Sequence, residues 1–217
     1  MKSLAEMGSQ LVTQLHSPDG ADAQLHIHVL NLLSDGHPVR SQTLAVRLGW
    51  PHKEVEEQLA RVCDLERDRA GQVVGWGLTL RPTPHHLWLK GKWLSTWCAF
   101  DLLLYPAILG VETWGETTCP VTQQSIRFLV APQRVIEVHP KAAVLSLVLP
   151  SSSEDCSRTS FCGRSHGFAS QWVASVWQAT HPSAVVLSVE DAASLARHVA
   201  TSRNGHAATN LDPRPIS

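Results

Sequence analysis

Hydrophobic residues near the start of the chain recur at helical spacing. The four that recur at steps of three and four residues are Leu4, Met7, Leu11 and Leu15. This periodicity predicts an amphipathic helix over residues 3–16. A second helix is expected over residues 22–33, because the Asp35-Gly36 pair that follows is typical of a helix end.

The next segment has the pattern of a winged helix-turn-helix. A short helix is predicted to open over residues 38–45, and Gly49-Trp50-Pro51 turns the chain into a longer helix over residues 52–62. Residues 73–80 are predicted to form a strand. Two helices joined by a tight glycine-containing turn and followed by a strand are typical of DNA-binding modules, so DNA binding is one hypothesis.

The charges on the second helix of this motif argue against DNA binding. Its charged residues are Lys53, Glu54, Glu56, Glu57 and Arg61. The helix that enters the major groove would then present a net acidic face, which phosphates repel. A helical module used for packing is the favoured interpretation.

The composition changes after Arg81-Pro82-Thr83-Pro84, and we place a domain boundary near Pro82. An apolar helix is predicted over residues 95–109, and Trp88, Trp93 and Trp97 lead into it. Alternating patterns over residues 125–130, 134–138 and 144–149 predict strands, with antiparallel pairing because the connections are short.

The last third alternates again between helix and strand. A polar loop is expected over 151–158, a helix over 168–180, a strand over 184–187 and a helix over 189–200. Ser188 and Asp191 could form a capping box at the start of this last helix. The predicted fold class is α+β. A three-helix winged-helix-like module spans residues 1–82, a domain of small mixed or antiparallel sheets with flanking helices spans 83–203, and a disordered tail spans 204–217.

Composition and charge exclude several classes of protein. The 217 residues carry a formal net charge of -1, so no global charge favours a nucleic acid or an anionic membrane. The start of the chain lacks the pattern of a secretory signal. The longest apolar stretch, residues 97–111, contains Asp101 and Pro106 and is shorter than the roughly 20 residues that span a bilayer. We expect a cytoplasmic protein.

The cysteines are an odd set of five: Cys63, Cys98, Cys119, Cys156 and Cys162. Without a secretory context they are expected to be reduced thiols, each a candidate nucleophile or metal ligand. A helix over residues 95–109 would place Cys98 and Asp101 on one face in an apolar environment. Burial favours the neutral form of both groups, which suits an acid catalyst, whereas a lone cysteine is more often an inert core residue.

Cys162 follows the polar loop and precedes a predicted helix, whose N-terminus would lower the pKa of its thiol. Three competing hypotheses involve the same region. Gly163-Arg164-Ser165-His166-Gly167 matches the nucleophile elbow of serine hydrolases but does not follow an apolar strand. A zinc site with Cys162 and His166 and a thiol redox centre are both weakened by the lack of a C-x-x-C pair.

The order and spacing of these residues resemble a known family. The segments are Gly77-Leu78-Thr79-Leu80-Arg81, Trp97-Cys98-Ala99-Phe100-Asp101, Tyr105-Pro106-Ala107 with Gly110, Cys119, Ser146-Leu147-Val148-Leu149-Pro150, Ser160-Phe161-Cys162 and Phe168-Ala169-Ser170. Together they resemble the bacterial organomercurial (alkylmercury) lyases over nearly the whole chain. The resemblance implies a winged-helix-like module without a DNA-binding role and a family-specific α+β domain.

The resemblance also implies roles for individual residues. Cys98 and Cys162 are expected to be the mercury ligands. Asp101 is expected to complete the mercury site with them and to shuttle the proton. Cys119 matches a cysteine that looks structural. Some members of the family have a second cysteine where this chain has Gly163, so an accessory thiol is missing here.

The implied chemistry agrees with the residue types, because soft thiolates bind soft metals. An organomercurial would be the substrate, a hydrocarbon and Hg(II) the products, and a mercuric reductase or a cytosolic thiol the acceptor of Hg(II). No cofactor, nucleic acid or membrane is expected, and the protein is expected to be a monomer or a homodimer. The alternative is a metal-sensing winged-helix regulator.

Overall fold

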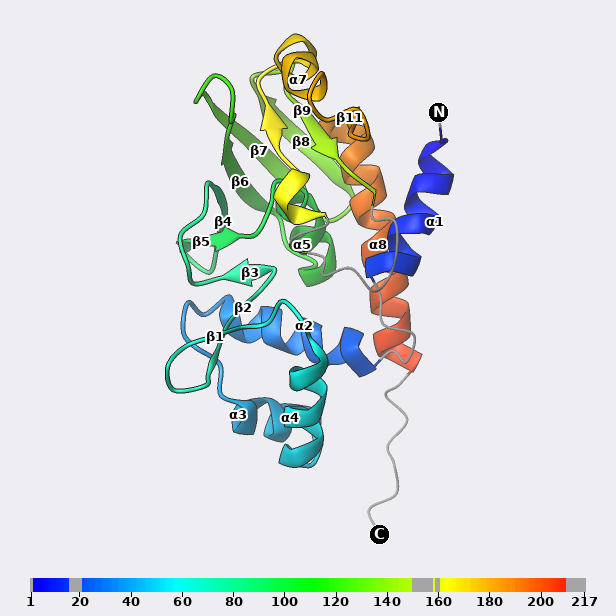
Figure 1. Ribbon diagram of the computed structural model, residues 1–217. Helices are drawn as coiled ribbons and strands as arrows, with labels where there is room; N and C mark the ends of the chain where they lie inside the picture. Colours follow the sequence, from blue (N-terminus) through cyan, green and yellow to red (C-terminus); the bar gives the residue numbers. More distant parts are fainter. Residues whose placement is uncertain (1, 16–20, 150–157, 159–160, 210–217) are drawn as a thin grey trace.

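The computed structural model describes residues 2–15, 21–149, 158 and 161–209. Its architecture is mixed α and β, as the sequence predicts (Figure 1). The helices of the described residues are α1 (Leu4–Leu15), α2 (Ala21–Leu33), α3 (Ser41–Leu48), α4 (His52–Arg61), α5 (Asp101–Leu109), α7 (Gln171–Gln178) and α8 (Val189–Thr209), with a 3-10 turn η1 (Cys162–Arg164).

The strands form two antiparallel sheets. The larger sheet has eight strands in the order β1 (Glu66–Arg67), β2 (Val73–Trp76), β3 (Leu78–Thr79), β5 (Lys92–Thr96), β4 (His85–Leu89), β6 (Thr113–Thr118), β7 (Ser125–Ala131) and β8 (Arg134–His139). The smaller sheet has three, in the order β10 (Gly167–Phe168), β9 (Val144–Leu147) and β11 (Val185–Ser188). The predicted antiparallel pairing is confirmed.

The larger sheet crosses the position at which we expected a domain boundary. Helices α2, α3 and α4 with strands β1 to β3 form the predicted winged-helix-like module, at the lower end of Figure 1. Strand β3 then pairs with β5, so that Leu78 lies opposite Thr96. The wing of the module is therefore hydrogen-bonded to the sheet that leads to Cys98, although a division into domains near Pro82 stays a prediction.

Helix α8 ties the two ends of the chain together. It lies beside α1 and α5 (Figure 1), and its N-terminus has the predicted capping box, in which Ser188 Oγ accepts from the Asp191 N–H at 3.0 Å. Near its other end the buried Arg203 donates to the Leu15 carbonyl at 2.7 Å and to Nδ1 of His26. These contacts anchor the helix near Arg203. It continues to Thr209, so the prediction of a disordered tail is wrong for residues 204–209.

The helix predicted over residues 95–109 is wrong at its start. Residues 92–96 form β5, which pairs with β4 in a two-residue hairpin at Lys90 and Gly91. Both turn residues have positive φ, 48° and 80°, as this hairpin type requires. The helix α5 begins only at Asp101 and is buried on nearly all sides, so its sequence lacks a polar face.

Three smaller expectations also need correction. The strand predicted over 73–80 is divided into β2 and β3 by Gly77, whose φ is 83°. The helix predicted from residue 168 begins at Gln171, after β10. Cys63 is disulfide-bonded, so the expectation of reduced thiols is wrong there, whereas Cys98, Cys119 and Cys162 are free. Cys156 and most of the expected 151–158 loop lie outside the described residues.

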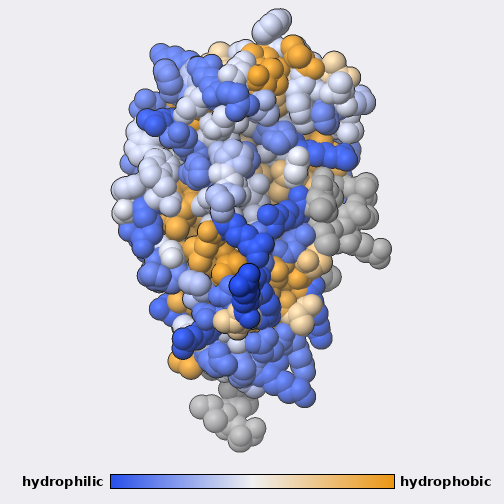
Figure 2. Space-filling model, turned by 60° about the vertical axis from the view of Figure 1, so that its left-hand side comes forward, coloured by the Kyte–Doolittle hydropathy of each residue, from blue (hydrophilic) through white to orange (hydrophobic). Residues whose placement is uncertain are grey.

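The surface that Figure 2 brings forward is mostly hydrophilic, with hydrophobic residues gathered near its middle. The β4–β5 hairpin lies on this side of the molecule and carries two half-exposed rings, Trp88 and Trp93, in edge-to-face contact at 5.5 Å. Among the described helices, none is both long and apolar enough to cross a membrane.

The capping box of α8 gives a stability prediction. Replacing Ser188 with alanine removes the side-chain acceptor of the Asp191 N–H and is expected to lower the free energy of unfolding by about 1 kcal/mol. Urea denaturation measures the change. The control is Ser175→Ala in α7, an exposed serine that bonds only the Trp172 carbonyl, for which a change below about 0.5 kcal/mol is expected. Equal losses in the two variants would contradict the cap's contribution.

Candidate active site

The first half of the site is the turn that leads into α5. Asp101 folds its side chain back so that Oδ2 accepts from the Cys98 N–H at 3.0 Å. This side-chain to backbone bond closes the turn of residues 98–101 directly before α5, whose N-cap is Phe100. Cys98 therefore lies just before the helix, and not on its face as the sequence suggested, yet its thiol and the carboxyl group still share one site.

The second half of the site is the turn around Cys162. This cysteine begins η1, which lies far from α5 in the sequence. Ser165 joins the two halves. Its Oγ accepts from the Phe100 N–H at 3.1 Å, and its carbonyl accepts from the Ala99 N–H at 3.2 Å. Its own N–H donates to the Cys162 carbonyl at 3.2 Å. One buried serine thus holds the two cysteine turns against each other.

Each turn is also anchored to a sheet. The Thr96 hydroxyl at the end of β5 donates to the Cys98 carbonyl at 3.1 Å. In the smaller sheet, the Ser146 hydroxyl of β9 donates to the Arg164 carbonyl at 2.9 Å and accepts from the His166 N–H at 3.1 Å. The site is therefore built where the ends of two sheets meet.

These contacts bring Cys98, Asp101 and Cys162 together. The two sulfur atoms and a carboxylate oxygen all lie within 4.8 Å of one another. Cys98 is fully buried, and Asp101 and Cys162 are 3% and 7% exposed. Two buried thiols and one buried carboxyl group form a candidate site for a soft metal with a proton donor beside it.

Burial sets the protonation state of the carboxyl group. It raises the pKa of Asp101 to about 7, against the opposing effect of hydrogen bonds from Cys98 and Tyr105. Near neutral pH this group is thus divided between its acid and its carboxylate forms. It can both accept and return a proton.

The two thiols differ in their surroundings. Burial raises the pKa of the Cys98 thiol, while a hydrogen bond from Cys162 works in the opposite direction. The pKa of Cys162 lies well above its usual value, first because it donates that hydrogen bond to Cys98 and then because it is buried. The expectation that a helix N-terminus lowers the Cys162 pKa is wrong, because α7 begins only at Gln171.

Aromatic side chains line both turns. Phe100 and Phe161 are in edge-to-face contact at 5.4 Å; Phe161 directly precedes Cys162, and Phe100 follows Cys98 by two residues. Trp97 is covered by the Arg158 guanidinium, which lies 5.1 Å from the ring centroid. Large aromatic side chains are therefore part of both turns that carry the cysteines.

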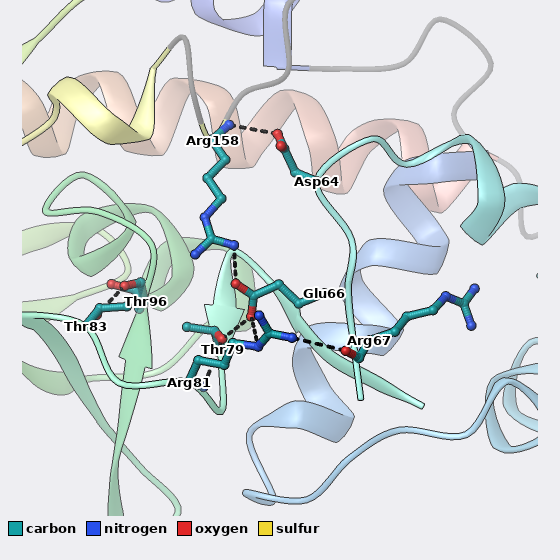
Figure 3. Close-up of polar contacts among 8 residues, drawn as sticks. All are labelled: Asp64, Glu66, Arg67, Thr79, Arg81, Thr83, Thr96 and Arg158. Atoms are coloured by element: carbon teal, nitrogen blue, oxygen red, sulfur yellow. Dashed lines mark hydrogen bonds and ion pairs between the residues drawn. The ribbon is translucent and has the colours of Figure 1, made fainter. Parts of the chain in front are cut away.

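A buried carboxylate connects this region to the wing of the N-terminal module (Figure 3). Glu66 on β1 accepts hydrogen bonds from Thr79 and from Arg158, and Arg81 lies 3.8 Å away. The Arg158 N–H also donates to Asp64 at 2.8 Å. Gly75 provides the space, because a Cβ there would lie 2.3 Å from the Glu66 carboxylate.

The structure speaks against two competing hypotheses. Ser165 of the apparent nucleophile elbow is fully buried, and its hydroxyl is engaged with the Phe100 N–H. The His166 ring contacts the Trp177 ring at 5.4 Å, and the cluster of potential metal ligands found among the described residues is Cys98, Asp101 and Cys162, without His166. Cys119 is buried apart from this cluster, at the end of β6.

Sequence reasoning missed several residues that build the site. Ser165, Ser146 and Thr96 are small polar residues whose partners lie far away in the sequence or in a neighbouring turn. The spacing of Cys98 and Asp101 was the one local signal, because an aspartate side chain can accept from the backbone N–H three residues earlier. It was overlooked because a helix was expected to begin before Cys98.

Comparison with known proteins gives a consistent result over both parts of the chain. The family model described as alkylmercury lyase matches residues 78–201. A second model, described as the helix-turn-helix domain of alkylmercury lyase, matches residues 6–77. The winged-helix module is therefore part of the enzyme family, and the alternative of a metal-sensing regulator is not supported.

Individual proteins agree with the family models. An alkylmercury lyase of Staphylococcus epidermidis is 38% identical over 200 residues, which cover 92% of each chain. One of Pseudomonas putida is 39% identical over 178 residues, 82% of this chain and 84% of the relative. The crystal structure of the mercury-bound form of MerB2 has the same fold, with a TM-score of 0.73 and 22% identity over 92% of this chain and 98% of that one.

Together, two family models that cover most of the chain and relatives that match it nearly end to end place this protein in the alkylmercury lyase family, as an organomercurial lyase.

Proposed function

We propose that Cys98, Cys162 and Asp101 cleave the carbon–mercury bond of alkyl- and arylmercury compounds by protonolysis. The observation that carries this proposal is the buried cluster of two thiols and a carboxyl group within 4.8 Å of one another. Two thiols suit mercury as ligands, and a carboxyl group can supply a proton. The assignment to the alkylmercury lyase family supports the proposal independently.

The two cysteines take the role of paired soft ligands. Each thiolate that binds mercury donates electron density to the metal, and two thiolates do so more strongly than one. The carbon bound to mercury becomes more basic and accepts a proton. Overall, R–Hg–X and two thiols give the hydrocarbon R–H, Hg(II) held by two thiolates, and HX, so that no oxidant or reductant is needed.

Asp101 takes the role of proton carrier. With a pKa of about 7 it accepts the proton of a thiol as that thiol binds mercury, and then donates a proton to carbon. A positioned general acid of this kind typically accelerates a reaction by about 10² to 10⁴. The burial of the site keeps water from competing as a less well placed donor.

The surroundings of the thiols suit an apolar substrate. The rings of Trp97, Phe100 and Phe161 flank the two cysteines in sequence and are themselves buried. An alkyl or aryl group on the bound mercury lies among such side chains at little desolvation cost. We therefore propose both alkyl and aryl compounds as substrates.

The product and the cellular context follow from the same chemistry. Hg(II) bound by two thiolates is transferred most readily to other thiols, either those of a mercuric reductase or small cytosolic thiols. We therefore propose a cytoplasmic enzyme. We propose that it needs no cofactor, binds neither nucleic acid nor membrane and acts as a monomer or homodimer. The module's charged helix α4, with its pair of Lys53 and Glu57 at 3.7 Å, supports the absence of a DNA-binding role.

The direct test is release of hydrocarbon and inorganic mercury from phenylmercury or methylmercury by the purified full-length protein with excess thiol. Both products are expected in equal amounts. A folded protein that binds the organomercurial but releases neither product would contradict the proposed reaction.

Variants of the three residues separate binding from cleavage. Cys98→Ser and Cys162→Ser are each expected to abolish turnover, because a hydroxyl is a poor ligand for mercury. Asp101→Ala is expected to bind mercury through both thiols and yet lose protonolysis. The amount of mercury bound per protein after dialysis measures binding, and the rate of hydrocarbon release measures cleavage. Full activity in either serine variant would overturn the mechanism.

The raised pKa of Asp101 also predicts a dependence of stability on pH. The folded-state pKa of about 7 lies above the unfolded value near 3.9, so the native state retains a proton that the unfolded chain loses. The contribution of this carboxyl group to stability is therefore full at acid pH and is lost as the pH rises from about 4 to about 7.

Urea denaturation of the wild type and of Asp101→Asn across this range measures the effect. The difference in unfolding free energy between the two proteins is expected to shift in favour of the asparagine variant as the pH rises. Buried histidines such as His85, whose pKa burial lowers to about 3, affect both proteins equally. A difference that stays constant with pH would contradict the proposed protonation state.

A further inference from the structure

Tyr105 is the one tyrosine of the chain, and the reaction described above gives it no role. It lies on α5 four residues after Asp101, a spacing that places two side chains on the same helix face. Its side chain is only 4% exposed. A buried phenol on the face that carries the proton donor needs a polar partner, because an unpaired hydroxyl in the core is costly.

The hydroxyl group of Tyr105 is confined by the wing of the N-terminal module. A Cβ placed on Gly77 would lie 1.5 Å from the Tyr105 oxygen and 2.5 Å from Cζ, so the tyrosine fills the space that any side chain at position 77 would take. Gly77 is itself fixed, because its carbonyl accepts from the Trp97 N–H at 2.8 Å. The ring of His26 supports the phenol from the module in an edge-to-face contact at 6.1 Å.

The place of Tyr105 on α5, one helical turn after Asp101, puts a phenol hydroxyl on the helix face that carries the carboxyl group, so that the hydroxyl is a candidate donor to it. A hydrogen bond between the side chains of Tyr105 and Asp101 is one cause that lowers the pKa of Asp101. Burial, and then the nearby charges of Asp101 and both cysteines, raises the pKa of Tyr105. The phenol thus keeps its proton and presents an O–H to the site.

We propose that Tyr105 is a positioning residue for Asp101, whose carboxyl group it holds through its hydroxyl group. The Cys98 N–H already binds Oδ2 of this carboxyl at 3.0 Å. A second donor, from the next turn of the helix, fixes the rotation of the carboxyl plane. This inference rests on the proposed function. Through Gly77, which confines the Tyr105 hydroxyl group, the N-terminal module would help to orient the proton donor.

A positioning role predicts an effect on the chemical step and not on mercury capture. The two thiols bind the metal whether or not the carboxyl group is oriented, whereas proton transfer to carbon depends on its direction. Tyr105→Phe removes only the hydroxyl group. We expect kcat to fall about tenfold, with KM and the affinity for Hg(II) changed less than about twofold.

The matched control is Thr117→Val, which removes another fully buried hydroxyl, the one that pairs with Nδ1 of His85 at 2.7 Å. It is expected to lower stability as much as Tyr105→Phe does, but to leave kcat unchanged. Urea denaturation of both variants gives the stability, and kinetics with phenylmercury give kcat and KM.

A second readout exploits the single tyrosine. Growth on 3-fluorotyrosine places one fluorine next to the hydroxyl group, and the labelled enzyme is expected to retain the wild-type kcat because it keeps the donor. Its fluorine NMR signal is expected to shift in Asp101→Ala. The signal is expected to stay in place in Asp35→Ala, which removes an exposed carboxylate that pairs with Lys90.

The outcomes distinguish the two proposals. If the wild type releases no hydrocarbon, the proposed function fails, whatever the variants do. If the wild type is active and Tyr105→Phe keeps the kcat of Thr117→Val, or if the fluorine signal is the same in Asp101→Ala and wild type, the role of Tyr105 is overturned. If Tyr105→Phe does not fold, the fluorine signal decides.

Discussion

The burial of two thiols and a carboxyl group within 4.8 Å of one another is the constraint on which the rest of this structure depends. Each group would be charged or hydrated in water, and each is kept neutral or paired here because the surrounding core is apolar. Burial places the Asp101 pKa near 7, where the group can carry a proton in either direction. The reactivity of the site is thus a consequence of the packing around it.

That packing is supplied by two sheets and by contacts between distant segments. Ser165 joins the Cys162 turn to the start of α5, while Ser146 and Thr96 fix each turn to the end of a strand. The wing of the N-terminal module continues the larger sheet, so Gly77 bonds the backbone directly before Cys98. A module with a DNA-binding pattern has become a structural part of an enzyme.

The sequence indicated the fold best where neighbouring residues decide it. The strands β7, β8 and β9 lie where they were predicted, with regular alternation of burial in β7, and α8 begins at the capping box of Ser188. The hairpin of β4 and β5 was missed because its stability comes from pairing with β6 and β3, and a run of large apolar residues there equally suits a helix. The position of Arg203 was missed for a related reason, because its partners His26 and Leu15 lie at the other end of the chain.

The sequence by itself determined the identities and order of Cys98, Asp101 and Cys162, and through them the chemistry and the family, because soft ligands and a proton donor are properties of residue types. Only the tertiary structure decided that Cys98 lies before the helix, that Cys162 is a buried thiol with a raised pKa, and that the Tyr105 hydroxyl fills the space at Gly77. A pKa depends on what surrounds a group in space. That environment is built by residues far apart in the chain, whose contacts no local pattern records.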